Sequence, residues 1–227
     1  MTDQLPSLIL KKGEDRRLRA GHLWIFSNEV DTKRSPLTDL EAGSLVQVEA
    51  AGWRPLGLAY VNPHSLISAR LLTHGKALPD FGKLLRRRIR GALALRERLF
   101  EQPYYRLVFG ESDLLPGLVV DRFGDVLVVQ IATAGMEARR GAIIEALQAE
   151  ISPRGIVIQN HLPMRELEGL PVGANEIIGE VPEKLDVIEN GIRFSVDLLA
   201  GQKTGWFFDQ RDNRARLGRY VKGKRVL

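Results

Sequence analysis

The feature that most constrains the fold is a change in the spacing of apolar residues near residue 80. From 7 to 73, short apolar stretches alternate with Gly, Pro and Asn turn signals, which is typical of a small β-barrel or sandwich. The predicted strands lie at residues 8–10, 45–48, 56–61 and 65–72. From 81 to 101, apolar residues recur every three or four positions, which predicts an amphipathic helix. A β domain is therefore followed by a helix.

The outward face of this predicted helix is basic. Most of its charged residues fall opposite the apolar stripe, namely Lys83, Arg86, Arg87, Arg90, Glu97 and Arg98. A solvated helix surface explains this arrangement, and a dedicated nucleic-acid helix is the less favoured alternative. The net charge of +5 and the isoelectric point of about 9.6 leave the same choice open.

Residues 104–185 mix the patterns of strands and helices. The predicted elements are a strand pair at 118–120 and 126–131, a helix at 136–151 and a strand at 155–159. The short loop at 122–125 makes the strand pair a hairpin, and Pro153 ends the helix because proline cannot continue it. This order indicates a compact unit of the α+β class.

The clearest local signal is the pair Asn190-Gly191, which separates the apolar stretches 184–189 and 192–197. Asn and Gly both tolerate positive φ angles, so the pair suits a type I′ turn. We therefore predict a β-hairpin over these residues. A helix is predicted to follow at 206–217.

A glycine-bracketed loop, GQKTG at 201–205, connects the hairpin to that helix. It is not a phosphate-binding loop, because Gln202 separates the first glycine from Lys203 and position 196 is Val196 rather than glycine. A loop that leads into a helix N-terminus suits an anionic group. A simple connection between hairpin and helix explains it equally well. We expect its polar residues, including Thr204, to lie at the surface.

Several side chains have competing structural and chemical interpretations. Glu111, Asp113 and Asp121 could hold a cation or act as acid and base, but acidic residues commonly form turns, and we favour that role. Trp24 and Phe26 alternate as residues on one strand face do, so we favour core packing for both. The charged residues at 209–214 form either a salt-bridged helix surface or a ligand-facing helix start.

The chain has no cysteine, which excludes disulfides, thiolate metal sites and a cysteine nucleophile within it. No two of its four histidines have H-x-x-x-H spacing, so no metal is expected. No apolar run approaches the roughly 18–20 residues that a membrane helix needs. The first residues lack the basic and apolar regions of a secretory signal, so we expect a cytoplasmic protein without a membrane partner.

Four stretches resemble a bacterial family of S-adenosylmethionine (SAM)-dependent 23S ribosomal RNA methyltransferases, the large-subunit methyltransferase I type. They are GHLWIFSNEV at 21–30, GESDLLPGLVVD at 110–121, RELEGL at 165–170, and the segment from Glu189 to Arg214. The first is similar to the opening of the family's PUA domain, a small RNA-binding barrel. The next two are similar to its central domain, and the last to the entry of its methyltransferase domain.

The resemblance implies an α+β chain with four parts. These are a PUA-like RNA-binding β-barrel at 1–73, a linker helix at 74–102, a central α+β domain at 103–185, and the start of a Rossmann-like methyltransferase domain at 186–227. That last domain is expected to be truncated, because Val226-Leu227 resembles the start of the strand that carries the cofactor. The chain is then the front part of a longer protein, without its catalytic residues.

The resemblance also implies SAM as the cofactor and 23S ribosomal RNA as the partner. The expected cofactor-binding residues are Lys203, Thr204, Gly205, Phe208, Asp209 and Arg211. The expected RNA-binding residues are Lys11, Arg17, His22 and Asn28. No catalytic residue and no metal ligand are expected in this chain, and a homodimer is left open.

The family's usual reaction is methylation of cytosine C5, which a thiolate activates by adding at C6. Because the chain has no cysteine, either the nucleophile lies beyond residue 227 or another atom is methylated. Two other functions stay open. One is a stand-alone RNA-binding module without catalysis, and the other is an enzyme that acts on a small molecule through the carboxylates at 111–121.

Overall fold

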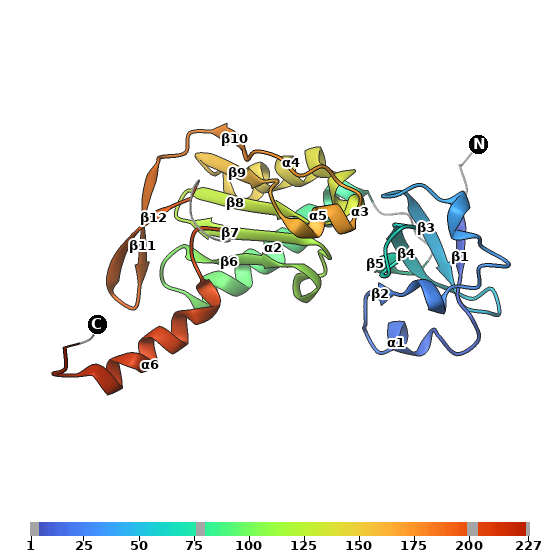
Figure 1. Ribbon diagram of the computed structural model, residues 1–227, viewed down its shortest axis with the longest axis horizontal. Coiled ribbons are helices and arrows are strands. Elements are labelled where there is room, and N and C mark those ends of the chain that lie inside the picture. Colours follow the sequence, from blue (N-terminus) through green and yellow to red (C-terminus); the bar gives the residue numbers. More distant parts are fainter. Residues whose placement is uncertain (1–4, 76–79, 199–203, 226–227) are drawn as a thin grey trace.

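The computed structural model describes residues 5–75, 80–198 and 204–225, which form a barrel-like unit, a central unit, and a hairpin followed by a helix (Figure 1). The first sheet has the strand order β1-β3-β4-β5-β2. Its strands are β1 (Ser7–Ile9), β2 (Trp24–Ile25), β3 (Leu45–Glu49), β4 (Pro55–Val61) and β5 (Ala69–His74). Strand β1 pairs with β3 in parallel, and the other pairs are antiparallel.

The two edges of this sheet are joined to each other. Backbone hydrogen bonds run from Lys11 to Glu29 over 2.9 Å and from Asp31 to Ile9 over 2.8 Å. They connect the segment after β2 to β1, so the sheet closes into a small barrel, as the short strands predict. Three short helices lie in its loops, namely α1 (Arg16–Arg19), η1 (Ser27–Glu29) and η2 (Leu37–Asp39).

Strand β5 begins later than predicted, at Ala69 instead of residue 65. The chain turns at Asn62, whose side-chain oxygen accepts a hydrogen bond from the backbone of His64 over 3.1 Å. Such a side-chain turn competes with strand pairing, which explains the delay. The predicted core role of Trp24 is wrong, because Ile25 is the buried residue of β2 while Trp24 is 38% exposed.

Helix α2 (Phe81–Leu99) starts at Asp80, whose side chain accepts a hydrogen bond from the backbone of Lys83 over 3.0 Å. Its apolar face, which includes Leu85 and Ile89, packs into the core of the central unit. The helix predicted as a linker therefore lies against helix α4 and the central sheet.

The central sheet has the order β10-β9-β8-β7-β6, and only β8 and β9 are parallel. Its strands are β6 (Tyr104–Phe109), β7 (Leu118–Phe123), β8 (Val126–Ile131), β9 (Gly155–Gln159) and β10 (Glu176–Gly179). The predicted hairpin and the strand at 155–159 are confirmed, whereas β6 and β10 were not predicted. Two short helices, η3 (Gly110–Asp113) and α5 (Pro163–Leu167), lie in its loops.

The single helix predicted at 136–151 is wrong, because two helices form: α3 (Ala134–Glu137) and α4 (Arg140–Ile151). The break lets them pack in different places. Helix α3 lies against the barrel, where a Cβ at Gly135 would come within 2.0 Å of the ring of Tyr60. Helix α4 instead packs against α2.

The hairpin β11 (Lys184–Glu189) and β12 (Ile192–Asp197) is confirmed, and its turn residues Asn190 and Gly191 have φ angles of 53° and 77°. The hairpin shares a hydrophobic cluster with Phe123 and Val128 of the central sheet. Helix η4 (Phe208–Gln210) and helix α6 (Arg211–Val221) follow, so the helix begins later than the predicted residue 206.

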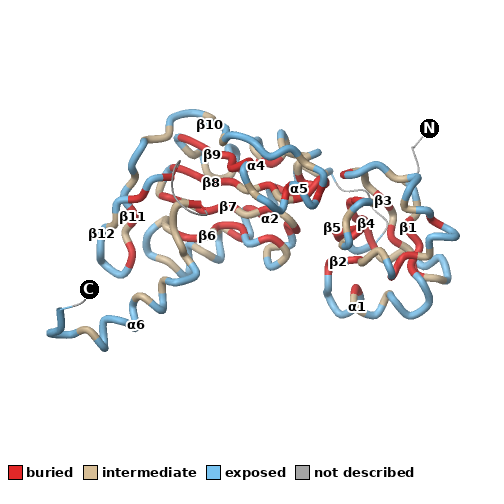
Figure 2. Tube along the Cα trace, viewed as in Figure 1, coloured by how far each residue is buried: buried red, intermediate tan, exposed pale blue. Residues whose placement is uncertain are grey.

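Helix α6 buries none of its residues and projects from the central unit (Figure 2). The predicted features at 201–203 and 226–227 lie outside the described residues. Within the residues that the structure describes, none of the helices has both the length and the apolar character needed to cross a membrane.

Candidate functional site

The four residues predicted to contact RNA lie in one neighbourhood of the barrel. Lys11 donates from Nζ to the backbone oxygen of Asn28 over 2.7 Å. Arg17 donates from Nη1 to Oε1 of Glu29, which follows Asn28 in the chain, over 2.9 Å. His22 is exposed and lines a hollow of about 290 Å³ together with Arg17. The structure therefore places the four residues in one region of the barrel, and their binding of RNA stays a prediction.

Trp24 lies in the same hollow and reaches the central unit. Its indole Nε1 donates to Oε1 of Glu111, in helix η3, over 2.6 Å. The hollow is therefore bounded by both units, since Glu111 also lines it. Sequence reasoning missed this placement, because the alternation of Trp24 and Phe26 does not show which neighbour the strand faces.

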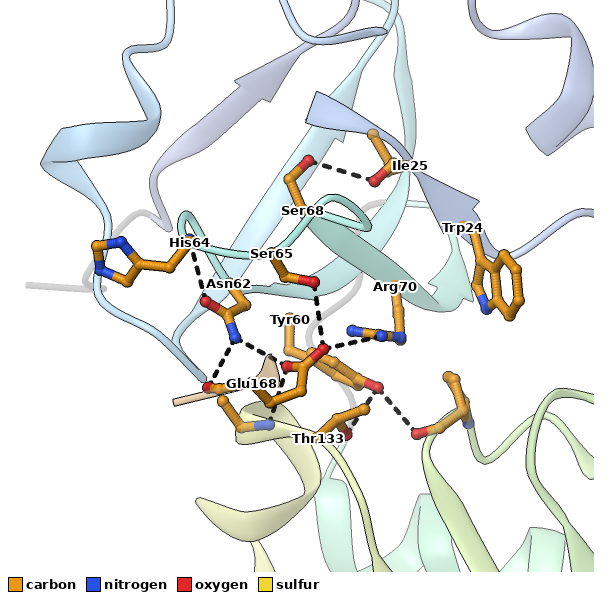
Figure 3. Close-up of polar contacts among 12 residues, drawn as sticks. Trp24, Ile25, Tyr60, Asn62, His64, Ser65, Ser68, Arg70, Thr133 and Glu168 are labelled. Carbon is orange, nitrogen blue, oxygen red and sulfur yellow. Dashed lines mark hydrogen bonds and ion pairs between the residues drawn. The ribbon is translucent and has the colours of Figure 1, made fainter. Parts of the chain in front are cut away.

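A row of three side chains crosses the barrel toward the central unit. The strand register pairs Trp24 with Arg70 and Arg70 with Tyr60, and directly paired residues project on the same face of a sheet. The Tyr60 hydroxyl donates to the backbone oxygen of Pro116 over 2.8 Å and lies 3.1 Å from Oγ1 of Thr133 (Figure 3). Burial raises the pKa of Tyr60 well above its usual range.

Glu168 is the hub of this junction, and it belongs to the RELEGL stretch (Figure 3). Its carboxylate accepts from Asn62 Nδ2 over 2.8 Å and pairs with Arg70 Nη2 over 2.9 Å. Ser65 and the backbone of Ala134 also donate to it. Arg70 is 6% and Glu168 4% exposed, so the ion pair is buried. In the sequence, the only sign that Glu168 matters is that the RELEGL stretch resembles the methyltransferase family.

The carboxylates at 111–121 do not form one site. Asp113 accepts two hydrogen bonds from Arg96, over 2.5 and 2.8 Å, and Asp121 accepts two from Arg106, over 2.9 and 3.0 Å. With Glu111 bound to Trp24, each carboxylate has its own side-chain partner, and within the described residues only Asp113 also accepts from a nearby backbone amide, that of Phe109 over 2.7 Å, as the favoured turn role predicts. No group of three His, Cys, Asp or Glu side chains suited to a metal ion occurs among the described residues.

Asp121 also links the central sheet to the loop that was predicted to approach the cofactor. Thr204 is buried, and its Oγ1 donates to Oδ2 of Asp121. The expected surface position of Thr204 is therefore wrong, because Thr204 lies against Asp121 of strand β7. Burial opposes the charge of Arg106, but its hydrogen bonds to Asp121 raise the pKa of the guanidinium above its usual value.

Arg211 and Arg214 surround the buried carboxylate of Glu189. Arg214 donates to both Glu189 oxygens over 2.5 and 2.9 Å, and Arg211 lies 3.6 Å from Oε2. Trp206 donates from Nε1 to the same carboxylate over 3.0 Å. Burial alone would raise the pKa of Glu189, but these partners hold it below its usual range. The salt-bridged interpretation of 209–214 fits this geometry.

Three of the predicted cofactor residues, Phe208, Asp209 and Arg211, line one hollow of about 320 Å³. Aromatic and aliphatic side chains form most of its remaining wall, among them Leu99 of α2, Phe100 directly after it, and Phe109 of β6. The Arg211 guanidinium carbon lies 4.5 Å from the centre of the Phe100 ring. Thr204 and Gly205 are not among the lining residues, and Lys203 lies outside the described part of the chain.

Comparison with known protein families identifies a PUA-like domain at residues 8–74. Ribosomal RNA large subunit methyltransferase I from Shewanella denitrificans is 39% identical over 222 residues, which are 96% of this chain and 55% of that protein. The protein of the same name from Klebsiella pneumoniae is 38% identical over 232 residues, or 100% of this chain and 57% of that protein. The chain thus spans about half the length of the curated relatives it matches.

Two solved structures share the fold. A candidate SAM-dependent methyltransferase from Streptococcus mutans matches 94% of this chain and 54% of its own, with a TM-score of 0.76 and 20% sequence identity. A candidate methyltransferase complexed with SAH matches 94% of this chain and 53% of its own, with a TM-score of 0.77 and 20% identity. At this level of identity the likeness shows the fold alone. The mixed α+β class with a PUA-like domain is confirmed.

Proposed function

Because the resemblance to the large-subunit ribosomal RNA methyltransferases I is confirmed over nearly the whole chain, we propose that the chain is part of such an enzyme. The observation that carries the proposal is the identity of 38–39% across both units and the C-terminal segment. The substrate is 23S ribosomal RNA, the methyl donor is SAM, and the target atom is cytosine C5. The protein acts in the cytoplasm.

The relatives are longer than this chain, which supports separate roles for its parts and for the residues outside it. We propose that residues 1–73 bind RNA, that 74–102 and 103–185 link and support this domain, and that 186–227 begin the methyltransferase domain. The remaining domain, including a thiolate for C5 chemistry, lies outside these 227 residues, which contain no cysteine. The chain alone is then inactive.

The hollow beside Phe208 suits part of the cofactor. Its aromatic wall fits an apolar or aromatic group, and Arg211 fits a carboxylate, since guanidinium groups bind carboxylates in a fixed geometry. When bound, SAM would supply an electrophilic methyl group. Thr204 and Gly205 do not line the hollow, and we propose that they act indirectly. They precede η4, whose residues Phe208 and Asp209 line it, and the bond of Thr204 to Asp121 helps to position that helix.

The decisive experiment is mass spectrometry of ribosomal RNA from a strain that lacks the gene. We expect 23S ribosomal RNA to lose one methyl group, on a cytosine, and to regain it when the gene is restored. Unchanged ribosomal RNA would exclude the proposal and favour the stand-alone RNA-binding module. The small-molecule enzyme is less favoured, because the carboxylates at 111–121 bind separate partners.

A further inference from the structure

Two hollows lie at the boundary between the barrel and the central unit, and a third adjoins them on the barrel side. The hollow at Trp24 shares Leu23 with a second hollow of about 270 Å³, which in turn shares His74 with a third of about 230 Å³. We call the three together the junction groove. Each is smaller than the roughly 300–1,000 Å³ of a typical small-molecule pocket. Small hollows that share lining residues suit an extended chain better than one compact ligand.

The lining of the junction groove is basic. It includes five arginines, namely Arg17, Arg19, Arg54, Arg87 and Arg88, against the single carboxylate of Glu111. Three of the five have an ion-pair partner beside the groove: Arg17 pairs with Glu29, and Arg19 and Arg54 share Asp15. Arg87, on the exposed face of α2, has no ion-pair or hydrogen-bond partner among the described residues. An array of this kind attracts a polyanion, and Arg87 is available for one of its phosphates.

One end of the groove carries an aromatic side chain with a fixed orientation. The hydrogen bond to Glu111 and the edge-on contact with Phe26, at 6.3 Å between ring centres, hold the Trp24 indole in place. More than a third of Trp24 still faces solvent. Exposed indoles beside basic residues are typical stacking platforms for unpaired bases, which every base can use because each has a π-face.

The middle of the groove contains a buried polar atom that has no hydrogen-bond partner among the described residues. It is Oγ1 of Thr73, and Thr73 lines the hollow beside Arg87. Buried polar atoms are nearly always paired, so an unpaired one beside a cavity indicates a ligand or water. Arg88 is fixed next to it by donating to the backbone oxygens of Leu72 and Leu114.

We propose that the junction groove binds an unpaired RNA strand, with one base stacked on Trp24 and a phosphate held by Arg87. This inference rests on the proposed function, because it names the form in which the RNA substrate is held. It extends the expected RNA surface from the barrel to helix α2 of the central unit. A base-paired helix would leave Trp24 without a free base face, so unpaired RNA is preferred.

The test uses fluorescence anisotropy with the purified 227-residue chain. The probes are a fluorescein-labelled single-stranded RNA of about 12 nucleotides and the duplex of the same sequence, at about 50 mM salt. We expect the single strand to bind more tightly than the duplex. Trp24→Leu should weaken its binding about tenfold, the order of effect that loss of one base–aromatic stack produces. Trp24→Phe keeps an aromatic face and should stay within about threefold of the unaltered chain.

Two further substitutions separate stacking from charge. Arg87→Ala should weaken binding about threefold to fivefold, and Glu111→Gln should tighten it about twofold because a negative charge leaves the groove. Arg219→Ala is the matched control, since it removes the same charge from α6, at the far end of the molecule from the barrel (Figure 1). Its affinity should be unchanged.

The alternative is that Trp24 only fastens the two units together. Thermal melting measures the fastening role, which Trp24→Phe and Trp24→Leu both lose because neither side chain can donate to Glu111. RNA affinity measures stacking, which only Trp24→Phe keeps. Equal affinities for these two variants would overturn the inference, as would preferential duplex binding or equal losses in Arg87→Ala and Arg219→Ala. If Trp24→Leu does not fold, the Arg87 and Glu111 variants decide. If the junction groove does not bind RNA, the ribosomal RNA methylation experiment still decides the proposed function.

Discussion

Arg70 of the barrel and Glu168 of the central unit form an ion pair of 2.9 Å in which both side chains are almost completely buried. Taking two charges out of water is costly, and the pair persists because Asn62, Ser65 and Ala134 also donate to the carboxylate. The junction between the two units is therefore built like a protein interior, which makes several results predictable.

Glu168→Ala should lower the free energy of unfolding by about 3–5 kcal/mol, because it leaves the charge of Arg70 buried and unpaired. Urea unfolding followed by circular dichroism measures the loss. Asp186→Ala serves as the control, since it breaks the exposed pair with Arg193, for which about 0–1 kcal/mol is expected. Similar losses in the two variants would contradict the buried role of Glu168.

Tyr60→Phe should cost about 1–2 kcal/mol at neutral pH, because the carbonyl of Pro116 then lacks a donor. The pH dependence provides a second readout. Burial raises the pKa of Tyr60 in the folded chain, so the stability due to its neutral hydroxyl is complete below pH 10 and falls as the unfolded phenol ionises above it. Stability should therefore decline less steeply above pH 10 in Tyr60→Phe, and parallel declines would argue against a buried hydroxyl.

Hydrogen bonds from Arg90 and Arg86 lower the pKa of Glu150 to about 2. The stabilising contribution of a carboxylate with a lowered pKa is present above its ordinary pKa of 4.5 and is lost as the pH falls toward 2. The difference in unfolding free energy between the unaltered chain and Glu150→Gln should shrink over this window. About 1 M salt should also reduce it, because these side chains meet at the surface. A difference independent of pH would contradict the pairing.

Thr204→Val and Arg211→Lys test the cofactor approach in the complete protein. If the loop positions SAM as proposed, both changes should raise the Michaelis constant for SAM. Thr204→Val should also lower stability by about 1–3 kcal/mol, because it buries an apolar group against the Asp121 carboxylate. A lower melting temperature with an unchanged Michaelis constant would leave the segment as a structural connector.

Isothermal titration calorimetry of SAM with the 227-residue chain should show weak binding or none. A charge-assisted contact with Arg211 supplies about 1–3 kcal/mol, whereas micromolar affinity needs about 8 kcal/mol. A micromolar dissociation constant would show that the pocket lies within these residues.

Local patterns predicted much of the secondary structure. The Asn190-Gly191 turn, the hairpin at 118–131 and the start of α2 depend on neighbouring residues, so the sequence alone defines them. The break between α3 and α4 could not be predicted, because it follows from the contact of Gly135 with Tyr60, which is 75 positions away in a different unit. The missed edge strand β10 is short and largely exposed, so it lacks the alternating pattern of a half-buried strand.

The site was predicted less completely than the fold. The resemblance to the PUA domain implied Lys11, Arg17, His22 and Asn28 as RNA-binding residues, and the structure places them in one region of the barrel. The junction residues Arg70 and Glu168 could not be paired from the sequence, since 98 positions separate them and both look like ordinary surface charges. Thr204 was misplaced for the same reason, because its partner Asp121 is 83 residues earlier.

The closely packed junction has a thermodynamic consequence for any ligand that touches both units. Two surfaces on a flexible tether must be ordered as they bind, and that lost freedom weakens the complex. Here Arg70, Glu168 and Tyr60 have already fixed one unit against the other during folding. Two contacts that are each weak then act as one, because a strand held at the barrel meets the central unit at a high effective concentration.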